Sequence, residues 1–468
     1  MSLSKVLVVL AGAAAGLASS AAAQTSESQA YRAELLADAA NRTSLLAAGG
    51  AGRDDKGFYI TDGGAYKLYI KGYSIFRYTA NFRSKREGTE TDPEPDATRI
   101  TDQDNFTHGF TNRVTKLGVE GTLWDPNFYF KIRGAFSNGG SRVIEIEDPA
   151  DPDATLASFR SGTDGAFSLD DAFLKYSWEN GFFMQGGQFT VPLLRERNVE
   201  EQFQLATERS VTTAYFQPGR AQGIALGYGG DQFRFVAGFT DGWRSQNTDF
   251  NDSREADWGL TARAEFKGAG EWGQFSDFTN WRDANQGWLL GAGVHYQQSG
   301  DTGDGIDHEN SSSMGTDVFM YSIDASYEGA GWNLFGSFTG VNVDSDVEGS
   351  ASVDDFGAVI HGGVFVTDQV ELFGRWDALF IDSDFLSGGD PDVDIDSDFH
   401  FGTLGMNYYI SPKSHAAKIQ ADLTWSFNKT DAIKASPILG SPLGTNVAQL
   451  GQRKSGEIGF RVQAVVVF

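Results

Sequence analysis

Hydrophobic and polar residues alternate one by one at the C-terminal end of the chain. In the segment 457–468 the apolar positions are every second residue, and the segment 418–428 repeats the pattern. The apolar set includes Ile458, Phe460, Val462, Ile419, Leu423 and Trp425, and the polar set includes Glu457, Arg461, Lys418, Gln420 and Asp422. A helix would instead group its apolar residues at spacings of three and four. The pattern therefore predicts β-strands with one apolar and one polar face.

The same alternation recurs in segments of about ten residues along most of the chain, which is typical of a transmembrane β-barrel. We expect sixteen strands, an even number, as a closed single-chain antiparallel barrel requires. They lie near 64–82, 107–123, 127–138, 166–178, 181–191, 220–229, 231–243, 256–267, 287–298, 317–328, 331–343, 355–366, 369–382, 397–410, 415–428 and 455–468. The predicted fold class is thus all-β.

Connection lengths alternate between short and long, as expected when hairpins at one end of a barrel are tight and those at the other end are loops. Asp125-Pro126 and Gly229-Gly230-Asp231 are short, whereas 192–219 is a long connection. One connection breaks the alternation: 268–286 has nineteen residues where a tight turn is expected. If it hides another strand pair, the barrel has eighteen strands, which is the main structural alternative.

The N-terminal end predicts export. Lys5 precedes an apolar run at 6–17, and an Ala-rich site predicts cleavage of a signal peptide after Ala23, spanning 1–23. An Ala- and Leu-rich stretch within 24–52 predicts a short periplasmic helix or linker, and 53–468 the barrel domain. No later run of about 20 apolar residues predicts a membrane-spanning helix. The expected location is the bacterial outer membrane, with its lipid as a partner.

Composition excludes several functions. The net charge is −26, and removing Lys5 with the signal gives 36 − 63 = −27, which argues against nucleic-acid binding. There is no Cys and no H-E-x-x-H or G-x-S-x-G motif, so we expect neither thiolate chemistry nor an enzyme. No cofactor is expected. Asp392, Asp394, Asp396 and Asp398 could bind divalent cations, although solvated acidic loops are the favoured interpretation.

The predicted strands place charged residues on their inward faces, where they would line an aqueous channel. The basic ones are Lys67, Lys71, Arg77, Lys131, Arg133, Lys175, Arg234, Arg263, Arg375, Lys418 and Arg461. The acidic ones are Glu120, Asp257, Glu265, Glu371, Asp377, Asp422 and Glu457. Most remaining acids fall in long loops, such as 301–309 and 382–398. A positively charged interior below an acidic rim favours anions at a constriction, and general hydration of a pore is the alternative.

One segment carries a family resemblance. Within 166–228, Gly187-Gln188-Phe189 and Val191-Pro192 are followed by Glu208-Arg209-Ser210 and Pro218-Gly219-Arg220. This order and spacing resemble the phosphate-selective porin O/P family. The resemblance implies a trimer of sixteen-stranded barrels, inward-folded loops, and basic side chains that conduct phosphate or similar anions. A terminal Phe468 likewise resembles the signal read by the outer-membrane assembly machinery.

The connection 192–219 follows a strand and is too long for a hairpin, so we expect it to fold inward and shape the constriction. The residues expected at the narrowest zone are Arg195, Arg197, Arg209, Arg220 and Arg234. The same connection carries Glu196, Glu200, Glu201 and Glu208, so its arginines could instead be held in a buried ionic network. The expected function is a passive porin for small hydrophilic solutes that prefers anions. A general or cation-preferring porin and a plugged structural barrel are the alternatives.

Overall fold

The structure is a computed structural model. It describes residues 50–54, 57–61, 66–83, 105–136, 141–148, 151–162, 167–250, 252, 255–299, 316–345, 352–383, 397–430, 433 and 456–468. The chain divides into two compact units, Met1–Tyr69 and Ile70–Phe468. The predicted signal peptide, nearly all of the predicted helix at 24–52, and Asp392, Asp394 and Asp396 of the candidate cation-binding run lie outside the described residues. Asp398, the fourth residue of that run, begins a strand.

In the first unit, β1 (Ala51–Asp54) and β2 (Gly57–Thr61) form an antiparallel hairpin in which Ala51 lies opposite Ile60. The last residues of the predicted linker therefore belong to a strand. Lys67, predicted to line the lumen, lies in this unit and bonds Asp54 at 2.9 Å. Its ammonium also lies 4.2 Å from the centre of the Tyr59 ring.

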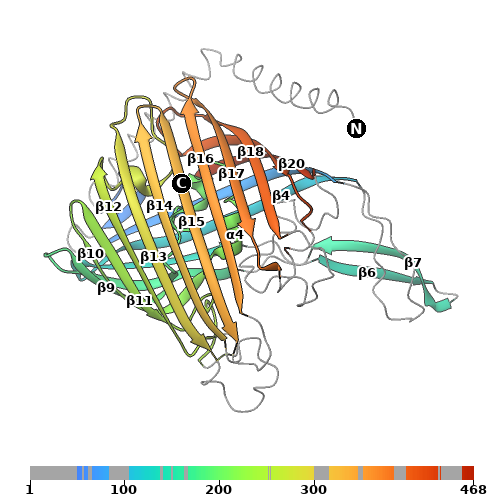
Figure 1. Cartoon of the computed structure of the whole chain (residues 1–468), viewed down its shortest axis with the longest axis horizontal. Coiled ribbons are helices and arrows are strands. Elements are labelled where there is room, and N and C mark those ends of the chain that lie inside the picture. The colour runs from blue at the N-terminus through green and yellow to red at the C-terminus, as the bar shows by residue number, and fades with distance from the viewer. Residues whose placement is uncertain are drawn as a thin grey trace. The chain divides into compact units, whose positions relative to one another are not determined.

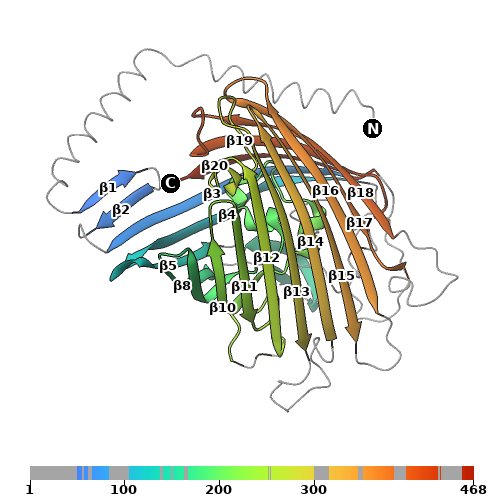
Figure 2. The same ribbon diagram turned by 60° about the vertical axis from the view of Figure 1, so that its left-hand side comes forward.

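The second unit contains a closed antiparallel barrel (Figures 1 and 2). Its sixteen described strands are β3 (Lys67–Phe82, which begins in the first unit), β4 (Phe106–Leu123), β5 (Asp125–Phe136), β8 (Phe167–Ser177), β9 (Phe182–Thr190), β10 (Arg220–Gly229), β11 (Phe233–Thr240), β12 (Trp258–Ala269), β13 (Gly287–Ser299), β14 (Thr316–Gly329), β15 (Trp332–Ser345), β16 (Val353–Phe365), β17 (Val370–Phe380), β18 (Asp398–Tyr409), β19 (Ala417–Ser426) and β20 (Ile458–Val467). Successive strands pair, and β20 pairs with β3, with Val462 opposite Tyr78. The predicted sixteen-stranded barrel is confirmed.

Apolar side chains of the strands point outward and remain exposed. Leu404 on β18 is 71% exposed, whereas its neighbour Thr403 is 1% exposed and faces the interior. Leu226, Ile323 and Ile360 are likewise more than half exposed on their strands. A band of exposed apolar side chains around a closed barrel suits contact with hydrocarbon rather than with water.

A further hairpin lies in the connection between β5 and β8. β6 (Ser141–Asp148) pairs with β7 (Asp151–Gly162) in a two-stranded sheet separate from the barrel sheet. These two strands were not predicted, because 139–165 falls between two predicted strands and reads as a long connection.

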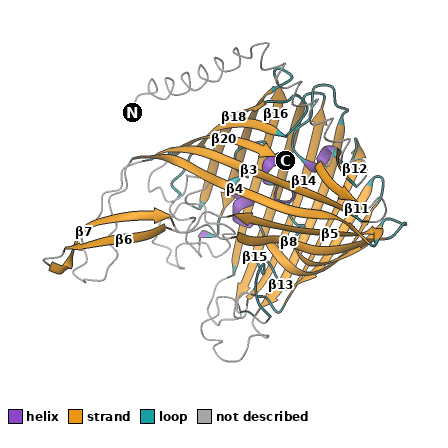
Figure 3. Ribbon diagram, turned by 180° about the vertical axis from the view of Figure 1, so that it is seen from behind, coloured by secondary structure: helices purple, strands orange, loops and turns teal. Residues whose placement is uncertain are grey.

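The connection 192–219, called the inward loop below, folds into the barrel as predicted (Figure 3). It contains α3 (Arg195–Asn198), the 3₁₀ turn η1 (Glu201–Phe203) and α4 (Val211–Phe216). Ser210 caps α4, because its hydroxyl accepts a hydrogen bond from the Thr213 amide at 2.9 Å. Tyr215 and Phe216 of α4 pack in one apolar cluster with Val318, Met320, Val341, Val353, Leu379, Phe399 and Phe401 of the wall.

The anomalous connection also folds inward. Residues 270–286, called the inner turn below, form the 3₁₀ turn η2 (Gln274–Ser276) and no strand, so the eighteen-strand alternative is wrong. Phe278 of the inner turn packs with Phe335 and Phe373 of the wall and with Leu205 of the inward loop. Its length is explained by this packing: it fills part of the lumen. None of the described helices is long and apolar enough to cross a membrane.

Candidate ion-conducting constriction

Several predicted lumen arginines lie beneath the inward loop and hold it to the wall. Arg77 donates to Glu208 and to the Thr207 carbonyl, the latter at 2.8 Å. Arg375 donates to the Glu208 carbonyl at 2.8 Å. Arg263 donates to the Leu193 carbonyl at 2.9 Å and pairs with Asp324. These side chains are almost fully buried, so they position the loop rather than meet solute.

Carboxylates of the wall hold the loop in the same way. Asp422 accepts from the Thr207 amide at 3.0 Å and also pairs with Arg461 at 2.8 Å. Asp377 accepts from the Val211 amide at 2.6 Å. The Tyr215 hydroxyl donates to Asp355 at 2.6 Å. Inward-facing charged side chains on several strands thus hold successive parts of the inward loop. This role explains why so many of these side chains are paired.

Two glutamates of the loop are internal anchors. Glu196 accepts from the Ser210 amide at 2.8 Å and from the Ser210 and Thr213 hydroxyls at 2.6 Å. Glu208 receives both Arg77 and Arg113. Burial alone would raise the pKa of Glu208, but these two guanidinium groups lower it to about 2. Both glutamates therefore stay ionised at neutral pH and are occupied by the protein itself.

The acid limit of this anchor can be predicted from its pKa. Because the folded-state pKa of Glu208 is lowered from 4.5 to about 2, its stabilisation is complete above pH 4.5 and is lost as the pH falls towards 2. We expect the Tm of the barrel to fall between these two pH values, and to fall less steeply in Glu208→Gln. Thermal unfolding followed by circular dichroism measures this. If the Tm of wild type and of Glu208→Gln fell equally steeply with pH, Glu208 would not be the group whose protonation weakens the anchor.

Beside the loop lies a cavity of about 220 Å³, called the constriction cavity below. Cationic side chains outnumber carboxylates in its lining by six to three. The cations are Lys116, Lys131, Arg133, Arg197, Arg209 and Arg220, and the carboxylates are Asp171, Glu200 and Glu201. Predicted constriction residues Arg197, Arg209 and Arg220 and predicted lumen residues Lys131 and Arg133 are thus brought together here.

Most of these cations are paired. Arg133 and Arg220 both pair with Asp171, at 2.6 and 2.8 Å. Arg133 also pairs with Glu200, and although burial raises the pKa of Glu200, Arg133 and Lys131 lower it to about 2. Arg209 donates to the Val199 carbonyl at 2.7 Å. Because six cations line the cavity and three carboxylates do, this pairing still leaves an excess of positive charge.

Arg197 differs from the others. Within the described part of the chain its guanidinium forms no hydrogen bond or ion pair, and its Nε is buried. Burial, with Arg209 and Arg220 nearby, lowers the pKa of Arg197 to about 9. The protonated guanidinium is therefore held without a direct ion-pair partner among the described residues, although Glu201 and Asp170 lie near enough to act on its pKa. An anion entering the cavity would supply that partner, and Arg197 provides donors suited to bidentate binding.

The other two predicted constriction residues lie elsewhere. Arg195 is buried and donates to Ser326 at 2.9 Å and to the Phe275 carbonyl at 2.8 Å, so it joins the inward loop, the wall and the inner turn. Arg234 pairs with Glu265 and lies 4.3 Å from the Trp272 ring. Both line a second cavity of about 730 Å³, called the vestibule cavity below.

The two cavities adjoin, because they share lining residues Gln185, Phe189, Thr190, Asn198 and Glu200. The vestibule cavity is also lined by Gly181 and Gly229, beside short connections of the barrel, so it lies towards that end. Together they lie along the side of the lumen that strands β3 to β12 line. The opposite side is filled by the inward loop and the inner turn.

Two remaining predictions concern ends of strands. Lys71 pairs with Glu120 at 2.5 Å, and neither residue lines the constriction cavity. Phe468 exchanges backbone hydrogen bonds with Gly72, each 2.9 Å long, and its side chain is half exposed. Its role as an assembly signal stays a prediction.

Sequence reasoning missed Lys116, which pairs with Asp170 at 2.7 Å and lines the constriction cavity. The signal was present, since Lys116 has the same parity on its strand as Glu120, which was assigned inward. It also missed the aromatic lining, including Tyr73 and Phe189. The signal was present for Tyr73 too, since it has the same parity on its strand as Lys71 and Arg77, which were assigned inward.

Comparison with known proteins bears on the fold. No protein-family model matches the chain, and no curated protein sequence matches it. Among solved structures, the chain is similar to the anion-selective porin from Comamonas acidovorans, at 11% identity and a TM-score of 0.52, over 86% of this chain and 99% of that one. OprB of Pseudomonas putida matches at 12% identity and a TM-score of 0.51, over 92% and 96%. Salmonella typhi OmpF, solved with daunomycin, matches at 11% identity and 0.51, over 88% and 100%. These likenesses show that the barrel has the fold of outer-membrane porins.

Proposed function

We propose that this protein is an outer-membrane porin through which small hydrophilic solutes diffuse passively, with a preference for anions. The observation that carries the proposal is Arg197, a cation without a protein partner among the described residues, in a cavity with six cations and three carboxylates. A narrow aqueous site with excess fixed positive charge attracts anions and repels cations. The predicted signal peptide and the exposed apolar band support a place in the outer membrane.

Phosphate and similar small oxyanions are the proposed solutes. They suit the constriction cavity because Arg197, whose guanidinium has no hydrogen-bond partner among the described residues, lines this space of about 220 Å³ and offers donors for bidentate binding. The family resemblance supports the same solutes and a homotrimer, assembled through a signal at Phe468. The proposed barrel would be surrounded by outer-membrane lipid and would perform no catalysis.

Arg197→Met tests the proposal. In planar bilayers under a KCl gradient, the purified protein is expected to show a reversal potential of the sign that indicates chloride preference. Arg197→Met is expected to reduce the anion-to-cation permeability ratio about threefold, since it removes the unpaired charge and keeps a side chain of similar length. Arg197→Lys should restore most of it, because it restores the charge.

Arg282→Met is the matched control, because Arg282 is half exposed in the inner turn and reaches Asp368 at 3.6 Å. It should leave the ratio unchanged. A wild-type reversal potential showing cation preference would overturn the proposed anion preference. Phosphate selectivity additionally requires that inorganic phosphate reduce the chloride current. The filled half of the lumen favours one alternative, a plugged structural barrel, which would show no stepwise conductance.

A further inference from the structure

We propose that the vestibule cavity is a binding site for aromatic carboxylates, which it would hold before they pass the constriction cavity. The inference rests on the proposed porin function and names a solute class for it. The vestibule has a volume of about 730 Å³, within the range of small-molecule sites and several times that of a phosphate ion.

The first observation is the lining of this cavity. Aromatic rings from three parts of the chain face it: Phe183 and Phe189 from β9, Phe203 from the inward loop, and Trp272 and Phe275 from the inner turn. Trp272 is fixed by its indole, which donates to the Gly230 carbonyl at 2.8 Å. Such a surface offers water few hydrogen bonds. A planar aromatic ligand, by contrast, can pack its ring against it.

The second observation is a free cation. Lys175 on β8 lines the cavity, and its ammonium lies 3.8 Å from the centre of the Phe183 ring. It makes no ion pair or hydrogen bond with any described residue. The other vestibule cations are satisfied: Arg234 and Arg263 by Glu265, and Arg195 by Ser326 and backbone carbonyls. Lys175 is thus the group left to receive an anion.

An aromatic wall beside one unpaired ammonium matches a ligand with a ring and a single negative charge. A carboxylate would accept hydrogen bonds from Lys175, and its ring would lie against the apolar wall. A small inorganic anion would meet the charge and leave the wall in contact with water. A neutral aromatic molecule would meet the wall and leave Lys175 without a counterion. The shared lining residues then lead the ligand to Arg197.

The test uses the full mature chain, purified and folded in detergent, with benzoate, acetate and benzyl alcohol as probes in isothermal titration calorimetry. Benzoate is expected to bind about tenfold more tightly than acetate or benzyl alcohol, because only benzoate meets both the ring wall and the ammonium. Lys175→Met keeps the length of the side chain and should weaken benzoate binding about tenfold, to the level of benzyl alcohol.

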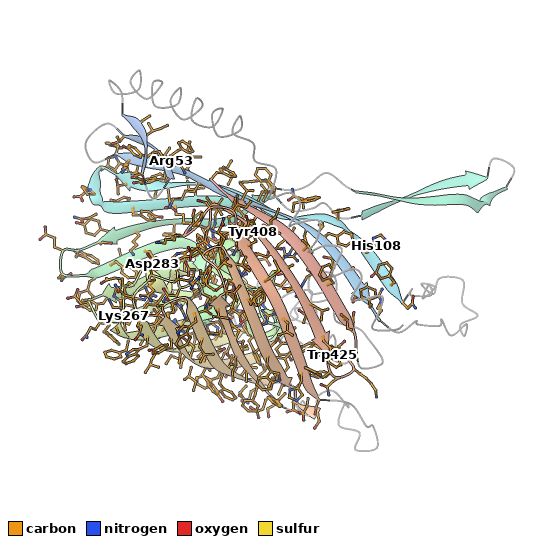
Figure 4. The ribbon with its side chains drawn as sticks, turned by 90° about the horizontal axis from the view of Figure 1, so that it is seen from above. Arg53, His108, Lys267, Asp283, Tyr408 and Trp425 are labelled. Carbon is orange, nitrogen blue, oxygen red and sulfur yellow. The ribbon has the colours of Figure 1, made fainter. Side chains whose placement is uncertain are left out.

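Lys267→Met is the matched control. Lys267 lies towards the end of the barrel where Asp283 of the inner turn lies (Figure 4). Its ammonium is 5.3 Å from the Trp272 ring, but it does not line the cavity. It should leave benzoate binding within about twofold of wild type. If both variants lost benzoate affinity equally, the effect would be one of general electrostatics, and the proposed site would be overturned. Equal affinities of the wild type for benzoate and acetate would also overturn it.

These failures are distinguishable from failure of the porin proposal. Binding in detergent needs no ion flow, whereas the porin proposal is judged by conductance and reversal potential. An anion-preferring channel that does not distinguish benzoate from acetate overturns the vestibule site alone. Tight, Lys175-dependent benzoate binding by a non-conducting barrel overturns the porin function and leaves the binding site standing.

Discussion

Glu208→Gln is expected to lower the free energy of unfolding of the barrel by about 3 kcal/mol, the usual cost of removing one partner from a buried ion pair. The change keeps the shape of the side chain but removes the negative charge with which Arg77 and Arg113 form ion pairs. Two guanidinium groups would then be buried beneath the inward loop with their principal counterion gone. Urea unfolding from lipid vesicles, followed by tryptophan fluorescence, measures the change.

The same substitution should loosen the inward loop before it unfolds the barrel, because the other anchors are separate from Glu208. Asp422 still accepts from Thr207, and Asp377 still accepts from the Val211 amide. We therefore expect larger fluctuations of the open-channel current. Glu179→Gln, in the exposed turn between β8 and β9, is the control and should change neither quantity. Unfolding energies equal within error for the two variants would contradict an anchoring role for Glu208.

The barrel could be predicted from the sequence because its wall is a repeated local pattern. Strand alternation arises because each strand of the wall has one exposed apolar face and one inward face, and it holds at positions such as Leu404 and Ile360, which are exposed apolar residues. The closing pair of β3 and β20 follows from an even strand count. The inward course of 192–219 was also predictable, because a loop of that length after Pro192 has no room in a hairpin.

The content of the lumen was not predictable, because it depends on contacts between residues distant in the sequence. The inward positions Met320 and Phe401 are apolar because α4 packs on them, and a rule of polar inward positions misassigns them. Arg195 carries the charge that suits a constriction. Its guanidinium instead donates hydrogen bonds to acceptors on β14 and in the inner turn. Pairing of Arg77 with Glu208 joins residues 131 positions apart. Parity gives the direction of a side chain but not its partner.

The inner turn shows this limit most clearly, and it gives the prediction with the largest expected effect on conductance. Ala269 lies opposite Trp288 in the sheet, so deleting 271–286 leaves Gly270 and Gly287 as a two-residue connection between paired residues. Gly-Gly suits such a connection because tight hairpins require positive φ, and Gly270 already has a φ of +86°. The strands should therefore still pair.

Deletion removes Phe275 and Phe278 from the lumen, together with Trp272 from the vestibule wall. We expect the single-channel conductance in KCl to rise roughly twofold or more, since ion flow follows the open cross-section of the pore. Anion preference should persist, because Arg197 and the residues around it lie outside the deleted segment. Benzoate binding should weaken, since Trp272 and Phe275 are both lost.

Phe278→Ser supplies the companion measurement, because it keeps the chain intact and removes one apolar anchor of the inner turn from its contacts with Phe335 and Phe373. It should give brief, reversible steps to the conductance of the deletion variant as the inner turn leaves the lumen. Folding of both variants is checked by heat-modifiable migration in gels. Unchanged conductance in a folded deletion variant would show that the inner turn lies away from the ion path. The path would then be set by the inward loop alone.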